Sequence, residues 1–239
     1  MPLAVPLAKR IARLDPVGDA GMASAAPVPA AARDAAMDAL DRGETHYTDR
    51  PGIVPLRERV AERLQADHGV QVDSKQGVVI TCGVTEARFV AVQQLLASGA
   101  GTVVALAHPE RLAGACAIRD VSLVGPDADP SSPVLVYLCE GADPAQRDAW
   151  LARAQAADWP VVAEVGPGFD GHPAAYGLHD RTVTIGDVGT PHGAEAWRIG
   201  FLAAPAATTG PLRDFKQALT ICTTNVTQWG ALALMEATA

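Results

Sequence analysis

The sequence predicts an α/β fold in which a mostly parallel sheet of seven strands carries helices on both faces. Two observations lead to this prediction: seven short apolar runs follow one another along the chain, and stretches with helical periodicity separate most of them. Strands buried on both faces read as unbroken apolar runs, and their alternation with helices is typical of parallel pairing. No helical stretch separates the last two runs, which allows an antiparallel pair there. The expected strands are residues 78–81, 102–106, 121–124, 134–138, 161–164, 182–185 and 199–203.

The expected helices follow from periodicity and from the residues at their ends. Leu56, Val60 and Leu64 lie at positions i, i+4 and i+8, so residues 54–67 should form an amphipathic helix. Gly43 follows a helical stretch over residues 32–40 and should end it. The chain then divides into an N-terminal arm and helix (1–40), a large α/β domain (41–205) and a helical tail (206–239). The other expected helices are residues 85–97, 111–118, 144–156, 212–219 and 226–237.

Composition and charge argue against several classes of protein. The 239 residues carry a net charge of −8 and contain no cluster of Lys and Arg, so a nucleic-acid partner is not expected. The four cysteines are too scattered for a zinc site or a redox pair and favour a reducing compartment. No apolar stretch reaches membrane-spanning length, and the N-terminal basic residues follow their apolar run, the wrong order for a signal peptide. We therefore expect a cytoplasmic protein with no metal site and no membrane partner.

Four segments, in a fixed order, carry a family resemblance. They are ALDRGETHYTDRPGIVPLRERVAERL, VVITCGVTEARFVAVQQLL, PVLVYLCEGADP with the later WPVVAEV, and TVTIGDVGTPHGAEAWRIGFLAAP. Together they resemble the class I and II aminotransferases, which are fold-type I enzymes that use pyridoxal phosphate (PLP). The resemblance covers roughly residues 35–205 and implies the fold of the large domain of these enzymes.

The resemblance implies a site for the cofactor phosphate. It assigns Gly83, Val84 and Thr85 to the start of the helix that cups the phosphate, where free N–H groups and the helix dipole favour an anion. It assigns Arg198 to the phosphate-binding guanidinium, and Tyr47 to the residue that reaches a neighbouring subunit's phosphate in family dimers. Taken singly, these residues also have ordinary structural interpretations, as a turn, a helix cap or a surface ion pair.

The lysine that holds the cofactor as a Schiff base is not found at its expected position. In the family it stands about eight residues before the arginine that matches Arg198, and here that position is Thr190. The chain's lysines are Lys9, Lys75 and Lys216, and none of them is expected in the pocket. A full family member also continues into a C-terminal small domain, which we expect this chain to lack.

Four further positions depart from the family pattern. Asp187 stands where a serine binds the phosphate, and a carboxylate there would repel a phosphate dianion. Asp143 stands where an asparagine binds the cofactor's ring oxygen, and Glu164 where an aspartate pairs with the ring nitrogen. Arg111 falls near the position of the aromatic side chain that stacks on the ring.

Three functions remain open on these grounds. The first is a lysine-less aminotransferase homologue with a binding or partner role, as a homodimer or as a heterodimer with a lysine-containing aminotransferase. The second is an enzyme of altered chemistry that binds PLP or another small phosphate ligand without a covalent link. Its acid and base candidates are Asp143, Glu164 and Asp187, with His108 and His192 nearby. The third is an active transaminase in which another lysine serves. A nucleotide-binding Rossmann site is not favoured, because the glycine-rich run at residues 99–101 precedes a strand instead of following one.

Overall fold

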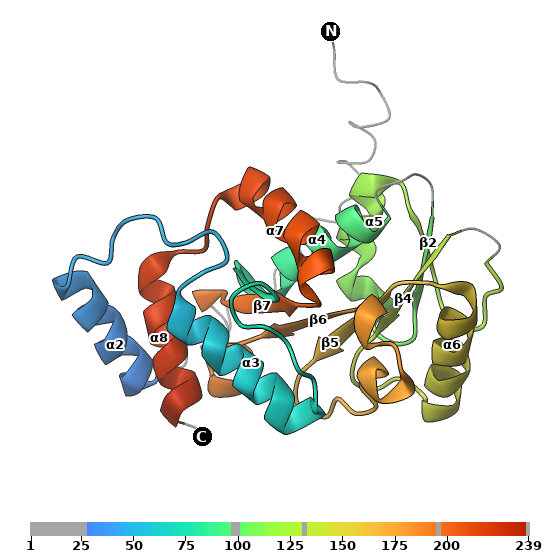
Figure 1. Ribbon diagram of the computed structural model, residues 1–239, viewed down its shortest axis with the longest axis horizontal. Helices are drawn as coiled ribbons and strands as arrows, with labels where there is room; N and C mark the ends of the chain where they lie inside the picture. Colours follow the sequence, from blue (N-terminus) through green and yellow to red (C-terminus); the bar gives the residue numbers. More distant parts are fainter. Residues whose placement is uncertain (1–27, 97–100, 131–132, 195–196, 238–239) are drawn as a thin grey trace, which may run out of the picture.

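The computed structural model describes residues 28–96, 101–130, 133–194 and 197–237 (Figure 1). The predicted N-terminal arm before residue 28, with Lys9, and the predicted helix end at residue 97 lie outside these ranges. The remaining helices and strands can each be compared with the sequence patterns that predicted them.

The sheet has seven strands in the order β1-β7-β6-β5-β4-β2-β3. Neighbouring strands from β3 to β6 run parallel, whereas β7 pairs antiparallel with both β1 and β6. This confirms the mostly parallel sheet and places its antiparallel strand at the helix-free connection. The strands are β1 (Val78–Thr81), β2 (Thr102–Ala105), β3 (Ser122–Val124), β4 (Val134–Leu138), β5 (Val161–Val165), β6 (Thr182–Asp187) and β7 (Gly200–Ala203).

Two predicted helices differ from the structure. The stretch expected at 111–118 divides into a 3-10 turn, which has Pro109 in its first turn, and a short helix that begins at Ala113. The helix expected at 212–219 begins earlier, at Ala206, and contains Pro211. Proline removes a backbone donor, so the pattern alone favoured a start after it. The helices are α2 (Ala30–Asp41), α3 (Val54–His68), α4 (Gly83–Leu95), α5 (Ala113–Arg119), α6 (Pro144–Ala157), α7 (Ala206–Thr220) and α8 (Asn225–Ala237), and the 3-10 turns are η1 (Pro109–Arg111), η2 (Pro173–Tyr176), η3 (His179–Arg181) and η4 (Thr190–His192).

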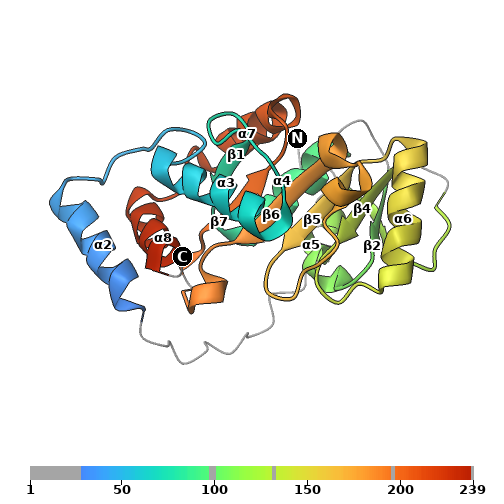
Figure 2. The same cartoon turned by 60° about the horizontal axis from the view of Figure 1, so that its bottom comes forward.

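Helices cover both faces of the sheet. One apolar cluster joins the sheet to α3, α6 and α8, and the other joins it to α4, α5 and α7. Residues of the predicted helical tail, Ala231, Leu232 and Met235, belong to the same cluster as α3. The tail helix α8 also packs along α2, as Figure 2 shows. The described helices include none that is long and apolar enough to cross a membrane.

The alternation of side chains along β5 decides which residues reach the candidate site. Val161, Ala163 and Val165 face the cluster of α3, while Val162 faces the cluster of α4. Successive strand residues point to opposite faces, so Glu164 lies on the α4 face at the carboxyl end of the strand. The parallel strands β5 and β6 both end at this edge of the sheet.

Candidate functional site

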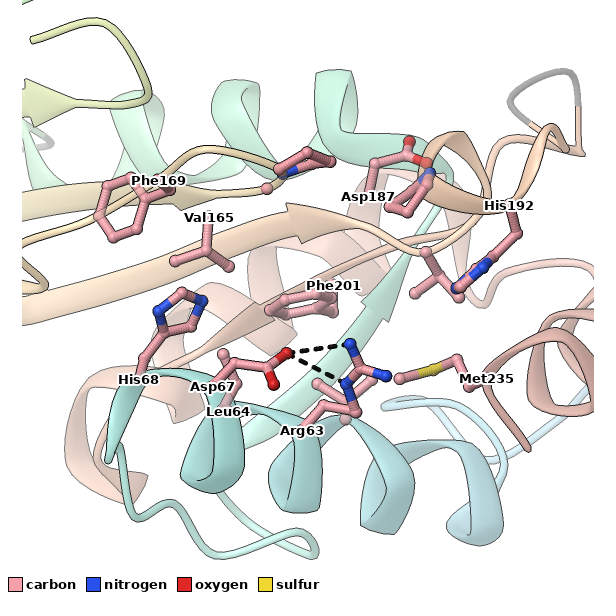
Figure 3. Close-up of a pocket in the computed structure, with 15 residues that line it drawn as sticks. Arg63, Leu64, Asp67, His68, Val165, Phe169, Asp187, His192, Phe201 and Met235 are labelled. Carbon is pink, nitrogen blue, oxygen red and sulfur yellow. Dashed lines mark hydrogen bonds and ion pairs between the residues drawn. The ribbon is translucent and has the colours of Figure 1, made fainter. Parts of the chain in front are cut away.

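Two cavities open at the carboxyl ends of β5 and β6. The smaller one, of about 200 Å³, lies against α4, and we call it the α4-side cavity. The larger one, of about 430 Å³, lies against α3, and we call it the α3-side cavity (Figure 3). Ligands of open α/β sheets typically bind at this edge, beyond the carboxyl ends of the strands. Both cavities are therefore candidates for the functional site.

The start of α4 has the close backbone packing that an anion cup requires. Gly83 has a positive φ of +76°, and a Cβ added there would lie 3.6 Å from Arg198. A Cβ at Gly200 would come within 2.6 Å of the Gly83 backbone, so β7 approaches the cup closely only because this residue is glycine. Thr85 and Arg198 are both exposed. The first turn of a helix leaves N–H groups without intrahelical partners, so this end can accept a phosphate.

A largely buried ion network lines the α4-side cavity. Glu164, only 6% exposed, accepts hydrogen bonds from Arg88 Nε at 2.6 Å and Arg88 Nη2 at 2.5 Å. It also accepts the Tyr137 hydroxyl at 2.7 Å and Arg111 Nη1 at 3.3 Å. Burial, with the Glu164 charge beside it, raises the pKa of Tyr137, so this hydroxyl stays protonated and donates.

Arg111 links this network to a second carboxylate. Its guanidinium donates to both oxygens of Glu140, at 2.6 and 3.1 Å. The hydrogen bond from Arg111 lowers the pKa of Glu140, and the same bond raises the pKa of Arg111. Both groups are therefore charged near neutral pH, and the guanidinium lies fixed between two carboxylates.

The residues present fit the phosphate end of PLP but not its ring and aldehyde end. Thr190, to which the resemblance assigns the position of the Schiff-base lysine, lies in η4 and carries a hydroxyl in place of an amine. Of the two lysines within the described ranges, neither lines either cavity: Lys75 is exposed, and Lys216 is fully buried in α7. The carboxylate assigned to the ring nitrogen, Glu164, is already held by two guanidinium groups and a phenol.

The structure brings together some of the residues predicted from sequence and separates others. Val84, Arg111, Glu164, Asp187 and Thr190 all line the α4-side cavity. Gly83, Thr85 and Arg198 lie beside it, at the start of α4.

Three other predicted residues lie outside this lining. Asp143 is the N-cap of α6 and accepts the Gln146 N–H at 2.9 Å, so the structure gives it a capping role. Tyr47 is 79% exposed on the loop between α2 and α3. His108 is exposed and contacts Glu110 at 3.0 Å, whereas His192 lines the α3-side cavity.

Three residues of the ion network were not predicted from the sequence. Arg88, Tyr137 and Glu140 had no assigned role, although one signal for Arg88 was available. Arg88 follows Val84 by four positions on a helix, so the two side chains lie on the same face, and a role for Val84 points to Arg88 as its neighbour. No comparable pattern marks Tyr137, which lies within an apolar strand.

The α3-side cavity combines apolar walls with polar groups from α3. Arg63, Asp67 and His68 project from the helix, and Phe201 lies between this helix and the strands (Figure 3). Arg63 Nη2 lies 3.0 Å from Asp67, and His68 packs edge-on against Phe169 with ring centroids 5.6 Å apart. The described residues contain no group of three or more His, Cys, Asp or Glu side chains arranged to bind a metal ion.

Comparisons with known proteins agree with the fold and with the resemblance. A family model described as aminotransferase class I and II matches residues 17–109. Arginine–pyruvate transaminase AruH of Pseudomonas aeruginosa is 32% identical over 229 residues, which cover 83% of this chain and 57% of that protein. Aromatic-amino-acid aminotransferase 2 of Thermococcus litoralis is 24% identical, over 83% of this chain and 59% of the relative.

Solved aminotransferase structures share the fold. A methionine aminotransferase from Escherichia coli, YbdL, superposes with a TM-score of 0.77 at 19% identity, over 87% of this chain and 63% of the other. N-Succinyldiaminopimelate aminotransferase of Mycobacterium tuberculosis superposes with a TM-score of 0.76 at 23% identity, over 86% of this chain and 62% of the other. The chain thus spans somewhat less than two thirds of the length of these relatives.

Proposed function

Because this chain belongs to the class I and II aminotransferase family, we propose that it is an aminotransferase-like binding protein that does not catalyse PLP-dependent transamination. The proposal rests on Thr190, to which the resemblance assigns the position of the Schiff-base lysine. A threonine hydroxyl cannot form an imine with an aldehyde, so the covalent step of the family's chemistry has no amine at this position. The protein would then act by binding a ligand or a partner subunit.

The ion network at the ring end of the cavity supports this proposal. A ring nitrogen needs a carboxylate that is free to pair with it, and Glu164 already accepts four hydrogen bonds from Arg88, Tyr137 and Arg111. Arg111 also occupies the region to which the resemblance assigns a stacking aromatic side chain. To admit the ring, the protein would have to break charge-assisted hydrogen bonds inside a largely buried network, which is costly.

A second candidate function is non-covalent binding of PLP or of another small phosphate ligand. The start of α4 favours it, because Gly83 keeps the close backbone approach and the exposed Arg198 forms no ion pair with any described carboxylate. Asp187 opposes it, since its carboxylate lines the same cavity and repels a phosphate. Such a ligand would bind through the α4 N-terminus and Arg198, with no catalytic step assigned to either.

Calorimetric titration with PLP and with pyridoxamine phosphate, followed by absorbance, tests both candidates. The binding-protein proposal expects no Schiff-base absorbance with PLP. Saturable binding of both compounds, weakened about tenfold or more by Arg198→Gln, would establish the non-covalent phosphate site. A Schiff-base band that borohydride reduction maps to Lys75 or Lys216 would contradict the proposal. Arg181→Gln is the control variant, because Arg181 lies in η3 directly before β6, at the opposite edge of the sheet from the start of α4.

A partner subunit is part of the same proposal. In family dimers the tyrosine that matches Tyr47 reaches the neighbouring active site, and Tyr47 is 79% exposed on its loop. We therefore propose a homodimer, or a heterodimer in which Tyr47 serves a lysine-containing aminotransferase. Sedimentation of the purified chain, alone and mixed with such an enzyme, measures both assemblies. A monomer in every mixture would rule out this role.

A further inference from the structure

The two cavities share part of their lining, and we call the two together the cleft. Five residues at the ends of β5 and β6 line both of them, and Asp187 is the charged one among the five. The shared residues are Val165, Gly166, Pro167, Asp187 and Pro191. A ligand in the α3-side cavity would therefore lie next to Asp187.

Every other fully charged side chain of the cleft already has an opposite partner. Three ion pairs account for them: Arg63 with Asp67 at 3.0 Å, Arg88 with Glu164 at 2.5 Å, and Arg111 with Glu140 at 2.6 Å. Asp187 forms no ion pair with any residue of the described ranges. One of its oxygens, Oδ1, accepts the Thr190 backbone N–H at 2.7 Å. The lining therefore has one uncompensated negative charge.

The histidines of the α3-side cavity do not supply the missing positive charge. Burial lowers the pKa of His68, and burial together with the Arg63 charge lowers the pKa of His192. Both imidazoles are therefore neutral near pH 7, and a neutral imidazole can accept a hydrogen bond. The cavity thus offers acceptors as well as an unpaired carboxylate.

The rest of the α3-side cavity is apolar. Leu64, Val165, Phe169, Phe201 and Met235 line it, and all five are buried. A volume of about 430 Å³ falls within the range of small-molecule sites, which combine apolar walls with a few polar groups. An aromatic ring or a short aliphatic chain would fit against these walls.

We propose that this cleft binds a small organic cation, a primary amine on an apolar body, with the ammonium group at Asp187 and the apolar body in the α3-side cavity. Complementary charge selects the amine, because an anion would meet an unpaired carboxylate. Burial of the apolar body against Phe169 and Phe201 supplies affinity. This site does not depend on PLP binding, since neither the α4 N-terminus nor Arg198 takes part in it.

Calorimetry with phenethylamine and phenylacetate tests the proposal, because these probes share a ring and differ in charge. We expect saturable 1:1 binding of phenethylamine, with phenylacetate weaker by about tenfold or more. Asp187→Asn keeps an oxygen that can accept the Thr190 N–H, so the local backbone should hold. Loss of a charge-assisted hydrogen bond should weaken amine binding by roughly ten- to a hundredfold.

Asp170→Asn is the matched control. Asp170 carries the same charge next to Phe169 but is exposed and does not line the cleft, so its substitution should leave amine affinity within about twofold. Thermal unfolding of each variant verifies that the fold is intact. The proposal is overturned if phenethylamine does not bind, if phenylacetate binds as well, or if Asp187→Asn leaves amine affinity unchanged in a folded protein.

Discussion

Replacing Glu164 by glutamine should destabilise the protein by about 3 kcal/mol or more, since removing one partner from a buried ion pair costs roughly 3–5 kcal/mol. The substitution keeps the shape of the side chain but removes the charge that holds Arg88, whose side chain is 13% exposed. Two charge-assisted bonds at 2.5 and 2.6 Å weaken, and the amide NH2 group faces a guanidinium with which it cannot bond. The remaining exposure of Arg88 places the expected loss at the lower end of this range.

Urea unfolding followed by tryptophan fluorescence at pH 7 measures this loss. The double variant Glu164→Gln with Arg88→Met also removes the stranded guanidinium, so it should be more stable than Glu164→Gln alone. Glu140→Gln is the control: its side chain is 34% exposed, so the loss should be about 1 kcal/mol or less. A loss below about 1 kcal/mol for Glu164→Gln, equal to that of the control, would refute the reasoning that this network is a buried, tightly held unit.

Three more predictions concern the pH dependence of stability, the packing of β7 against the start of α4, and an amine introduced at residue 190. Burial lowers the pKa of His172 to about 4, so between pH 6.5 and 4 the unfolded chain binds a proton that the folded chain excludes. The free energy of unfolding is therefore highest above pH 6.5 and should fall by roughly 3 kcal/mol by pH 4. Urea unfolding midpoints measured across this range should fall less steeply with pH for His172→Asn, which lacks the imidazole. Gly200→Ala should push β7 away from the start of α4, because the added Cβ would lie 2.6 Å from the Gly83 backbone. We expect the free energy of unfolding to fall by about 1–3 kcal/mol. Calorimetry should also show weaker binding of a phosphate ligand. Thr190→Lys supplies an amine on the wall of the α4-side cavity but leaves Glu164 held by Arg88 and Arg111, so we expect no Schiff-base absorbance with PLP. A Schiff-base band in this variant would show that the ion network admits the ring.

The sequence predicted the sheet well because burial on both faces leaves a strong pattern. Strands such as Val78–Thr81 and Val134–Leu138 are buried at every position, and both were predicted with their observed ends. Helix ends were predicted less accurately, because a proline inside a helix resembles the proline that often precedes a helix start. Pro211 lies inside α7, where packing against the sheet outweighs the lost hydrogen bond.

The sequence predicted the residues of the candidate site that follow strand ends or match the family pattern, but not the residues that contact them in the fold. Asp143, Glu164 and Asp187 were expected together because the ends of parallel strands converge at one edge of a sheet. Glu164 and Asp187 do line one cavity, whereas Asp143 caps α6 instead. The partners of Glu164 were not expected, since Arg88 and Tyr137 come from other elements and no local spacing connects them to it. The α3-side cavity was missed for the same reason: His68 and Phe201 are far apart in sequence and meet only in the fold.

Two residues that the resemblance marks as departures from the family pattern, Arg111 and Glu164, form an ion pair with each other. A buried charge without a partner would cost several kcal/mol. Here, Arg111 bridges Glu140 and Glu164, and Arg88 completes the set with two short bonds to Glu164. The carboxylate that the resemblance assigns to the ring nitrogen and the guanidinium at the stacking position thus satisfy each other. The ion pairs of the α4-side cavity thus compensate one another, and among its lining residues Asp187 is the charged side chain that forms no ion pair.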